Sequence, residues 1–299
     1  MTLIGYTMMC EQTGPKQLVR DVALAEEAGF DFAVISDHYF PWLEAQGHSP
    51  YAWSVHGAAA QATYRIPLMT YVTCPIRRYH PAVVAQKAAT MQLLSDGRFT
   101  LGLGAGENLN EHIVGGQWPL APVRHEMLTE AVEIIRALWA GGTVTYRGRH
   151  FDVESAKVWD LPESAPPIGI AVSGPASCLR AMDQFRWFTG CWRVNAELPV
   201  PASFDAAATM VREDDVSARM PCGPDAGRHV AGIREFAAAG VHPCGAGADR
   251  RGHARAVHHV GSYGTTALSP RGMTTGARWT ATPVHRRAPA TTCAGGRRA

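Results

Sequence analysis

The chain has 299 residues, of which 46% are hydrophobic and 18% charged, and its formal net charge is +2. This length suits one α/β barrel of ~250 residues, and the lack of any apolar run of about eighteen residues argues against a membrane-spanning helix. Seven cysteines without a Cys-x-x-Cys pair argue against a disulfide framework and a zinc knuckle, so we expect a cytoplasmic protein with no membrane partner.

The net charge combines two unlike regions. Residues 1–241 carry 19 Lys and Arg against 25 Asp and Glu, whereas residues 242–299 carry nine Arg and a single acid, Asp249. A basic tail can bind nucleic acid, but no aromatic residues alternate with these arginines. We therefore expect no nucleic-acid partner.

Apolar segments alternate with helix-like segments through the first half of the chain. The expected strands are 2–8, 32–36, 67–73, 99–103 and 168–172, the expected helices are 15–28, 51–62, 81–94 and 123–139, and a hairpin-like insert covers 146–153. This alternation is typical of βαβ units around a parallel sheet. It favours an α/β fold of the TIM (β/α)8 type.

The alternation stops after residue 172. Between residues 172 and 201, which include the aromatic-rich segment DQFRWFTGCW, no further strand of the buried type is expected. A helix-like run begins at Phe204. Residues 225–239 have the pattern of a helix that ends at Gly240. A complete eightfold barrel needs three more strands, so we expect an incomplete barrel.

Residues 242–299 have no pattern that could build a core. They contain one Leu and neither Ile nor Phe, among many Arg, Gly, Ala, Thr, Pro and His residues, which favours disorder. An out-of-frame reading of a GC-rich coding region would give this composition. We therefore interpret residues 1–241 as one barrel domain and residues 242–299 as a disordered, frameshifted tail.

The stretch GLGAGENLNEHIVGG places polar groups at the end of the fourth expected strand. Gly104 and Gly106 lack a Cβ, so the backbone can turn sharply there and approach a flat ligand closely. A plain strand-to-helix turn would also use such glycines. The acid Glu107 and the amides of Asn108 and Asn110 favour a functional site.

Asp37 and His38 end the second expected strand. A histidine at the carboxyl end of a barrel strand can exchange a proton near neutral pH, and a neighbouring Asp can orient its ring or anchor a ligand. A capped loop with a surface histidine is the alternative interpretation. Trp42, four residues later, is placed to line a ligand pocket, whereas Trp53 is expected in the core.

Two further segments belong to the same end of the barrel. After the third strand, Arg77 and Arg78 either meet an anionic cofactor tail or stay solvated, and His80 before Pro81 is expected to be structural. After the fifth strand, GIAVSGPAS offers free backbone N–H groups at a helix start, where a phosphate can bind.

A metal site is a competing interpretation, because His38, His80 and His112 lie near strand ends together with Glu107. Metallohydrolase barrels usually carry His-x-His on the first strand, and IGYTMMCEQ has no histidine. No Gly-x-Ser-x-Gly elbow is present either. We therefore expect neither a bound metal nor nucleophilic acyl transfer.

Taken together, SDHYFPW, TYVTCP, RYHPAVVAQ, GAGENLNEHIVG and AVSGP resemble the bacterial luciferase-like superfamily. Within it, they are most similar to the F420-dependent glucose-6-phosphate dehydrogenases and related F420-dependent oxidoreductases of actinobacteria. The resemblance covers residues 1–181 and implies a TIM barrel that binds the deazaflavin coenzyme F420. It implies hydride transfer between F420 and a small alcohol, lactol or carbonyl substrate. An FMN-dependent monooxygenase and an inactive or cofactor-binding-only remnant are the alternatives.

The resemblance also implies roles for single residues. His38 corresponds to the catalytic base, Glu107 to the acid that protonates the deazaflavin, and Trp42 to the aromatic residue that steadies the intermediate. The implied cofactor contacts are Asp37, Tyr71, Val72, Cys74, Asn110, Ser173, Gly174, Ala176 and Ser177, with a cis-type peptide at Tyr71-Val72 and Cys74 in place of a Thr. Glu107 must stay protonated to act as an acid, so we predict that burial raises its pKa.

The family pattern jumps between Ala181 and Met182 and resumes at DQFRWFTGCWRVNAELP. The missing segment would hold the sixth strand, the strand after it, and the Lys and Thr that bind phosphate in the sugar dehydrogenases. Glucose 6-phosphate is therefore not the expected substrate. Because relatives pair their barrels through helices, a homodimer is the expected assembly.

Overall fold

The computed structural model describes residues 3–172, 186–189 and 197–209, with a few positions between 225 and 234. The predicted junction at 181–182, most of the helix predicted over 225–239, and the predicted tail 242–299 lie outside the described residues. In the part of the chain that is described, no helix combines the length and the apolar character needed to cross a membrane.

A parallel sheet of six strands, in the order β1-β2-β3-β4-β7-β8, forms the centre of the described residues. The strands are β1 (Gly5–Met8), β2 (Phe32–Ile35), β3 (Leu68–Thr70), β4 (Phe99–Leu103), β7 (Ile168–Val172) and β8 (Arg186–Thr189). Within the described residues the sheet stays open at β1 and β8. This arrangement agrees with the predicted parallel, incomplete barrel.

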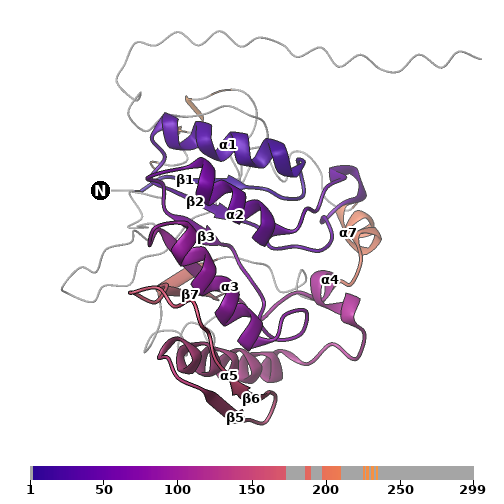
Figure 1. The fold of residues 1–299 in the computed structure, drawn as a ribbon. Helices are drawn as coiled ribbons and strands as arrows, with labels where there is room; N and C mark the ends of the chain where they lie inside the picture. Colours follow the sequence, from indigo (N-terminus) through magenta and orange to yellow (C-terminus); the bar gives the residue numbers. More distant parts are fainter. Residues whose placement is uncertain are drawn as a thin grey trace, which may run out of the picture.

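Four long helices lie side by side along one face of the sheet (Figure 1). They are α1 (Pro15–Ala28), α2 (Ala52–Ala62), α3 (Pro81–Leu94) and α5 (Ala121–Trp139). Proline suits the first turn of a helix because its φ is already helical and its missing N–H would have no partner there. This placement explains why α1 and α3 begin at Pro15 and Pro81, as predicted from the sequence.

The core lies between these helices and the strands. All four residues of β2 are buried, as is typical of a parallel strand covered on both faces, which explains its uninterrupted apolar sequence. Leu101 and Leu103 of β4 and Ile134 of α5 have no exposed surface. Burial of each such side chain contributes about 1.5–3 kcal/mol, so the core fixes where the strand ends lie.

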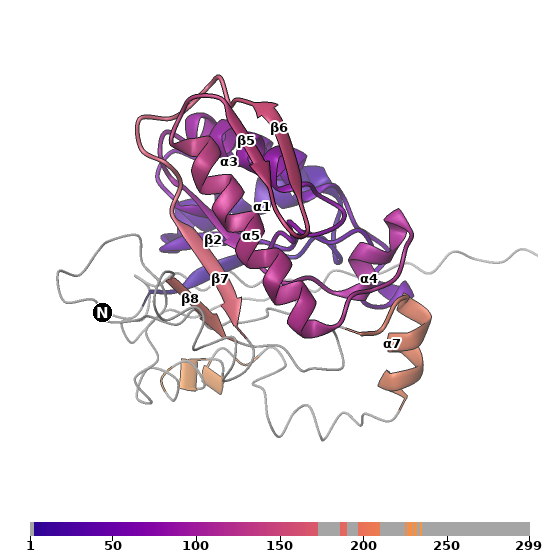
Figure 2. The same ribbon diagram turned by 90° about the horizontal axis from the view of Figure 1, so that it is seen from below.

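Smaller elements lie around the sheet. The predicted hairpin insert is present as the antiparallel strands β5 (Val144–Arg147) and β6 (Asp152–Ala156). The short helices are η1 (Glu44–Gln46), α4 (Asn108–Glu111), η2 (His112–Val114) and α7 (Pro201–Ala208). Figure 2 shows α7 beside α4, although about ninety residues separate them in the sequence, and α7 also contacts η1.

One prediction about the strands was wrong. No strand of the buried type was predicted between 172 and 201, but β8 lies within DQFRWFTGCW and pairs in parallel with β7, from Gly169 opposite Arg186 to Val172 opposite Thr189. Aromatic residues and Thr favour strands, but this run is short and begins with an Arg, so it lacks the pattern of a buried strand. Its backbone hydrogen bonds come from pairing with β7, which local sequence does not reveal.

Candidate active site at the carboxyl ends of the strands

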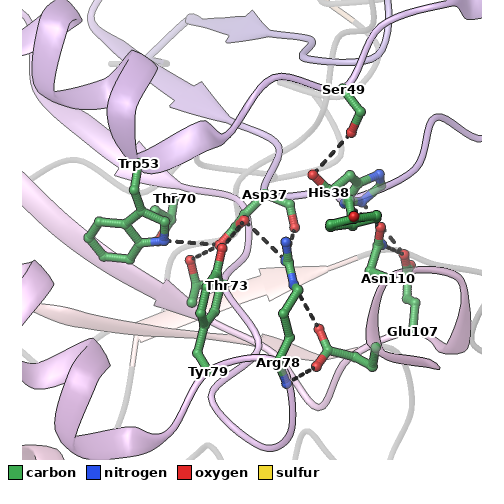
Figure 3. A network of polar contacts seen from close by, with 12 residues as sticks. Asp37, His38, Ser49, Trp53, Thr70, Thr73, Arg78, Tyr79, Glu107 and Asn110 are labelled. Carbon is green, nitrogen blue, oxygen red and sulfur yellow. Dashed lines mark hydrogen bonds and ion pairs between the residues drawn. The ribbon is translucent and has the colours of Figure 1, made fainter. Parts of the chain in front are cut away.

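Polar side chains from four neighbouring segments lie at the carboxyl ends of β1 to β4, and Figure 3 shows those that follow β2, β3 and β4. Glu11 follows β1, His38 follows β2, Thr73 follows β3 and Glu107 follows β4. Carboxyl ends of parallel strands meet at one edge of a sheet, where α/β proteins bind ligands. The sequence predicted His38 and Glu107 as site residues, and the structure brings them together.

The imidazole of His38 lies between two carboxyl groups. Its Nδ1 is 2.7 Å from Oε1 of Glu11, and its Nε2 is 3.6 Å from Oε2 of Glu107. Glu11 is fully buried and accepts a hydrogen bond of 2.9 Å from the Ser36 hydroxyl. The side chains of His38 and Glu107 keep 12% and 19% of their surface exposed. Glu11 thus orients the ring so that Nε2 faces the accessible carboxyl group of Glu107.

Both members of this pair have shifted pKa values. Burial, with a smaller contribution from the nearby carboxylate of Glu11, raises the pKa of Glu107 to about 7, in the direction predicted from the sequence. Burial alone would lower the pKa of His38, but the charge and hydrogen bond of Glu11, together with the charges of Glu107 and Asp37, outweigh burial and raise it. A histidine beside a carboxylic acid of raised pKa can exchange protons with a bound ligand.

Two aromatic rings extend from this pair toward α7. The ring of Trp42 meets that of His38 edge to face, with centroids 4.9 Å apart, and Phe204 of α7 meets Trp42 in the same way at 5.0 Å. Trp42 therefore lies beside His38, and its predicted place in the wall of a ligand pocket stays a prediction.

Asp37 has a different environment from its neighbour His38. Its side chain has no exposed surface, and both carboxylate oxygens accept hydrogen bonds from protein donors. Those donors are Nε1 of Trp53 at 3.0 Å, Oγ1 of Thr73 at 2.7 Å, the guanidinium of Arg78 at 3.1 Å and the hydroxyl of Tyr79 at 3.1 Å. We call these five residues the Asp37 node. The predicted contact between Asp37 and a cofactor stays a prediction, and the burial of this carboxylate favours a positioning role.

Arg78 joins the Asp37 node to α4. Its guanidinium also donates to the backbone carbonyl of Asp37 at 2.7 Å, and its backbone N–H donates to Oε2 of Glu111 at 2.8 Å. The side chain of Arg78 is 7% exposed, so it is neither a solvated loop arginine nor free to meet an anionic tail. Arg78 bridges the residue that precedes His38 and the helix that follows Glu107.

Asn110 supplies a second connection between the two sides of the site. Its Oδ1 accepts from the backbone N–H of Tyr39 at 2.8 Å, and its Nδ2 donates to Oε2 of Glu107 at 3.4 Å. Asn110 is 4% exposed. It therefore ties the loop after His38 to Glu107, and its predicted cofactor contact stays a prediction.

The glycines after β4 make room for the segment after β3. A Cβ at Gly104 would lie 2.6 Å from Cγ2 of Val72, and one at Gly106, whose φ is +80°, would collide with Sγ of Cys74. The neighbour that requires these glycines is therefore protein, where the sequence predicted a flat ligand. The peptide bond between Tyr71 and Val72 is cis, in agreement with the resemblance.

Cys74 has little accessible surface, with 5% of the residue exposed, and burial raises the pKa of its thiol well above the ordinary value. Its predicted contact with a cofactor stays a prediction. The other predicted cofactor contacts, Ser173, Gly174, Ala176 and Ser177, lie outside the described residues.

Sequence reasoning missed Glu11 and the donors Thr73 and Tyr79. A signal for Glu11 exists, because it is an acid shortly after a buried strand, as Glu107 is after β4. Among the described residues, no three His, Cys, Asp or Glu side chains are arranged to hold a metal ion. His80 accepts from the N–H of Ala82 at the start of α3, which gives it the expected structural role.

Two curated relatives of this chain are named as F420-dependent enzymes. An F420-dependent glucose-6-phosphate dehydrogenase of Microbacterium testaceum is 46% identical over 58% of this chain and 52% of its own length. Another enzyme of that name, from Nocardia farcinica, is 41% identical over 73% of this chain and 66% of its own length. The chain thus spans about half to two thirds of the length of these curated relatives.

A solved structure shares the fold over most of its length. The F420-dependent secondary alcohol dehydrogenase in complex with an F420-acetone adduct has a TM-score of 0.74 and 28% identity, over 80% of this chain and 90% of that protein. The sequence profile named luciferase-like monooxygenase matches residues 2–190. The expected incomplete TIM-type barrel agrees with these matches. This chain therefore belongs to the luciferase-like monooxygenase family.

Proposed function

We propose that this chain is an oxidoreductase that transfers a hydride between coenzyme F420 and a small alcohol, lactol or carbonyl compound. The observation that carries the proposal is the His38–Glu107 pair, with 3.6 Å between Nε2 and Oε2, both side chains partly accessible, and the pKa of Glu107 raised to about 7. Relatives named as F420-dependent dehydrogenases support the choice of coenzyme.

We propose that the coenzyme binds at this edge of the sheet, beside the partly exposed side chains of His38 and Glu107. F420 supplies a carrier that exchanges two electrons as a hydride. Oxidation of an alcohol then requires the protein to move two protons. Nε2 of His38 would accept the proton from the substrate hydroxyl. Glu107, which is largely protonated below pH 7, would deliver the second proton to the reduced coenzyme. Its raised pKa satisfies a requirement that an ordinary surface glutamate at neutral pH does not meet.

The remaining predicted residues would hold or orient the coenzyme. Asn110 contacts Glu107, and we propose it as a cofactor contact together with Tyr71, Val72, Ser173-Gly174 and Ala176-Ser177. Trp42 would wall the reacting centre beside His38. Glu11 acts through His38, because it holds the ring by Nδ1, so it is a positioning residue.

Two proposals concern the rest of the chain. We propose that residues 1–241 form one barrel domain and that residues 242–299 are a disordered tail that arose by a frameshift after Val241. A nucleotide sequence in which no single-base shift near Val241 restores an apolar strand and helix would contradict the second proposal. We also propose a homodimer, which the mass of the purified protein in solution tests.

The test is a titration of the full chain with F420 and, separately, with FMN, followed by tryptophan fluorescence and thermal melting. We expect F420 to bind and raise the melting temperature, and FMN to do neither. Substrate-dependent change in F420 absorbance should then appear, and His38→Ala and Glu107→Gln should abolish it while F420 still binds. The step that needs protonated Glu107 should slow as the pH rises through about 7, because the carboxyl group then ionises.

The outcomes separate the candidates. Binding of FMN without binding of F420 would contradict the proposal and favour a flavin monooxygenase. F420 binding without turnover of any alcohol, sugar or carbonyl compound would leave a cofactor-binding protein. A cooperative melt without binding of either coenzyme would show that the protein folds but that its site residues, inherited from an F420-dependent ancestor, no longer bind a coenzyme.

A further inference from the structure

The segment 197–209, which contains α7, lies against the site although it is distant in sequence. Its start is held at two points, because the side chain of Asn108 donates to the carbonyl of Glu197 at 3.2 Å and Arg124 pairs with the carboxylate of Glu197 at 3.0 Å. Its helix contacts η1 and presents Phe204 to Trp42. Figure 2 shows this segment running from α4 to α7. It therefore spans from the α4 side of the site to the Trp42 side.

What this segment presents to the site is apolar. The carboxylate of Glu197 is already paired, and the contact with Trp42 is made by the ring of Phe204, which is only partly buried. Two edge-to-face contacts, each about 5 Å between ring centroids, connect Phe204 through Trp42 to His38. An apolar surface thus extends from α7 to the residue proposed to take the substrate proton.

The basic groups around the site are engaged by the protein. Arg78 pairs with Asp37 and Glu111, and the ammonium of Lys87 lies 3.4 Å from the centroid of the Tyr79 ring. Arg77 donates to two backbone carbonyls, and Arg124 pairs with Glu197. A phosphate dianion beside His38 would have to displace one of these contacts, and the buried acids Glu11 and Asp37 would repel it.

We propose that Phe204 determines substrate specificity, by forming with Trp42 a wall that selects neutral alcohols and carbonyl compounds with an apolar substituent beside the reacting carbon. Phosphorylated sugars are disfavoured by the same site. This inference rests on the proposed function for its substrate class. It assigns a new role to one residue of α7, whose ring contacts the same Trp42 ring that His38 contacts.

The size of the effect follows from the burial of methylene groups. Each additional methylene that packs on the wall should strengthen binding about fourfold, until the substituent outgrows the ring surface. Without an aromatic ring at position 204, the apolar substituent of the substrate would stay exposed to water. Replacement of Phe204 by Ala should therefore weaken the dependence of affinity on chain length and leave acetone binding nearly unchanged.

The test measures equilibrium binding of methyl ketones from acetone to 2-hexanone to the full chain, by ligand-detected NMR. The variants are Phe204→Ala, Phe204→Leu, which keeps an apolar side chain, and Tyr64→Ala, a matched removal of an aromatic ring that is 83% exposed elsewhere. We expect a steep chain-length dependence in the wild type and the Tyr64 variant, an intermediate one with Leu, and a shallow one with Ala. Glucose 6-phosphate should not compete with 2-hexanone.

Each outcome of the binding experiment either supports or contradicts the proposed role of Phe204. The same chain-length dependence in Phe204→Ala as in the wild type, displacement of 2-hexanone by glucose 6-phosphate, or no ketone binding at all would overturn the inference. The proposed function fails separately, through the F420 titration. Chain-length-dependent binding that disappears in Phe204→Ala, in a protein that transfers no hydride to or from F420, would contradict the proposed function and leave the wall in place.

Discussion

Two acidic clusters lie next to each other at the same edge of the sheet and have opposite characters. In the Asp37 node, a carboxylate with no exposed surface accepts four hydrogen bonds from protein donors. In the His38–Glu107 pair, a partly exposed carboxyl group has a histidine 3.6 Å away and one amide donor at 3.4 Å. The carboxylate of Asp37 is surrounded by protein donors, whereas the carboxyl group of Glu107 keeps accessible surface.

The difference shows how one residue type serves two purposes. Four donors, one of them cationic, hold the side chain of Asp37 and thereby fix the loop that carries His38. Glu107 lacks such donors, so burial dominates and raises its pKa to about 7. A charge that is fully paired favours a positioning role, and an acid that is incompletely paired favours proton transfer. Substitutions that alter each cluster alone test this distinction.

The largest expected effect is on stability, from Arg78→Met. The variant leaves the carboxylates of Asp37 and Glu111 buried without their cation, which should lower the free energy of unfolding by about 3–5 kcal/mol. Denaturant unfolding measures this change. Arg77→Met is the matched control, because Arg77 lies in the same loop but binds backbone carbonyls at the surface, and it should cost less than about 1 kcal/mol. Equal losses in the two variants would refute the central role of Arg78.

A pH-dependent effect of intermediate size is expected from Glu107→Gln. Below the ordinary carboxyl pKa of 4.5, Glu107 is protonated in both the folded and unfolded states, so its ionisation does not affect stability. As the pH rises from 4.5 to about 7, the unfolded state loses its proton first and the wild type loses stability. The Gln variant should therefore become more stable than the wild type, by up to about 3 kcal/mol above pH 7.

Unfolding measurements of both proteins from pH 4 to pH 8 check this expectation. The difference between the two free energies of unfolding cancels the titrating groups that do not interact with Glu107, and it includes the change in the pKa of His38, which the charge of Glu107 raises. A difference that stays constant with pH would show that the pKa of Glu107 is not raised. The same substitution should abolish hydride transfer, so stability and activity would move in opposite directions, as trade-offs at proton-transfer sites do.

The sequence predicted the site better than it predicted the support of the site. Helices α1 and α3 and strands β4 and β7 have the expected bounds, because prolines, glycines and uninterrupted apolar runs mark them locally. His38 and Glu107 were recognisable for a similar reason, since each directly follows a strand. The donors to Asp37, in contrast, lie between 16 and 42 residues away from it along the chain, so no local pattern connects them.

Arg78 shows the same limit most clearly. From the sequence, two adjacent arginines in a loop are equally compatible with a solvated pair and with a phosphate contact. Only the folded chain shows that Arg77 stays at the surface and that Arg78 points between two buried carboxylates. β8 was missed for a related reason. Its sequence has no periodicity typical of a strand, and its strand structure comes from pairing with β7.

The smallest of these effects is expected from Tyr79→Phe, which removes one of the four donors to Asp37 and keeps the aromatic ring. A hydrogen bond to a charged acceptor contributes roughly 1.5 kcal/mol at the lower end of its range, so the variant should lose about that much stability, well below the loss in Arg78→Met. Tyr64→Phe, at an exposed tyrosine, controls for the loss of a hydroxyl and should change stability by less than about 0.5 kcal/mol. The pH at which hydride transfer falls should stay near that of the wild type, because three donors still hold Asp37 and neither His38 nor Glu107 loses a partner. If that pH moved as far in Tyr79→Phe as in a variant of Glu11, the two clusters would be one coupled unit.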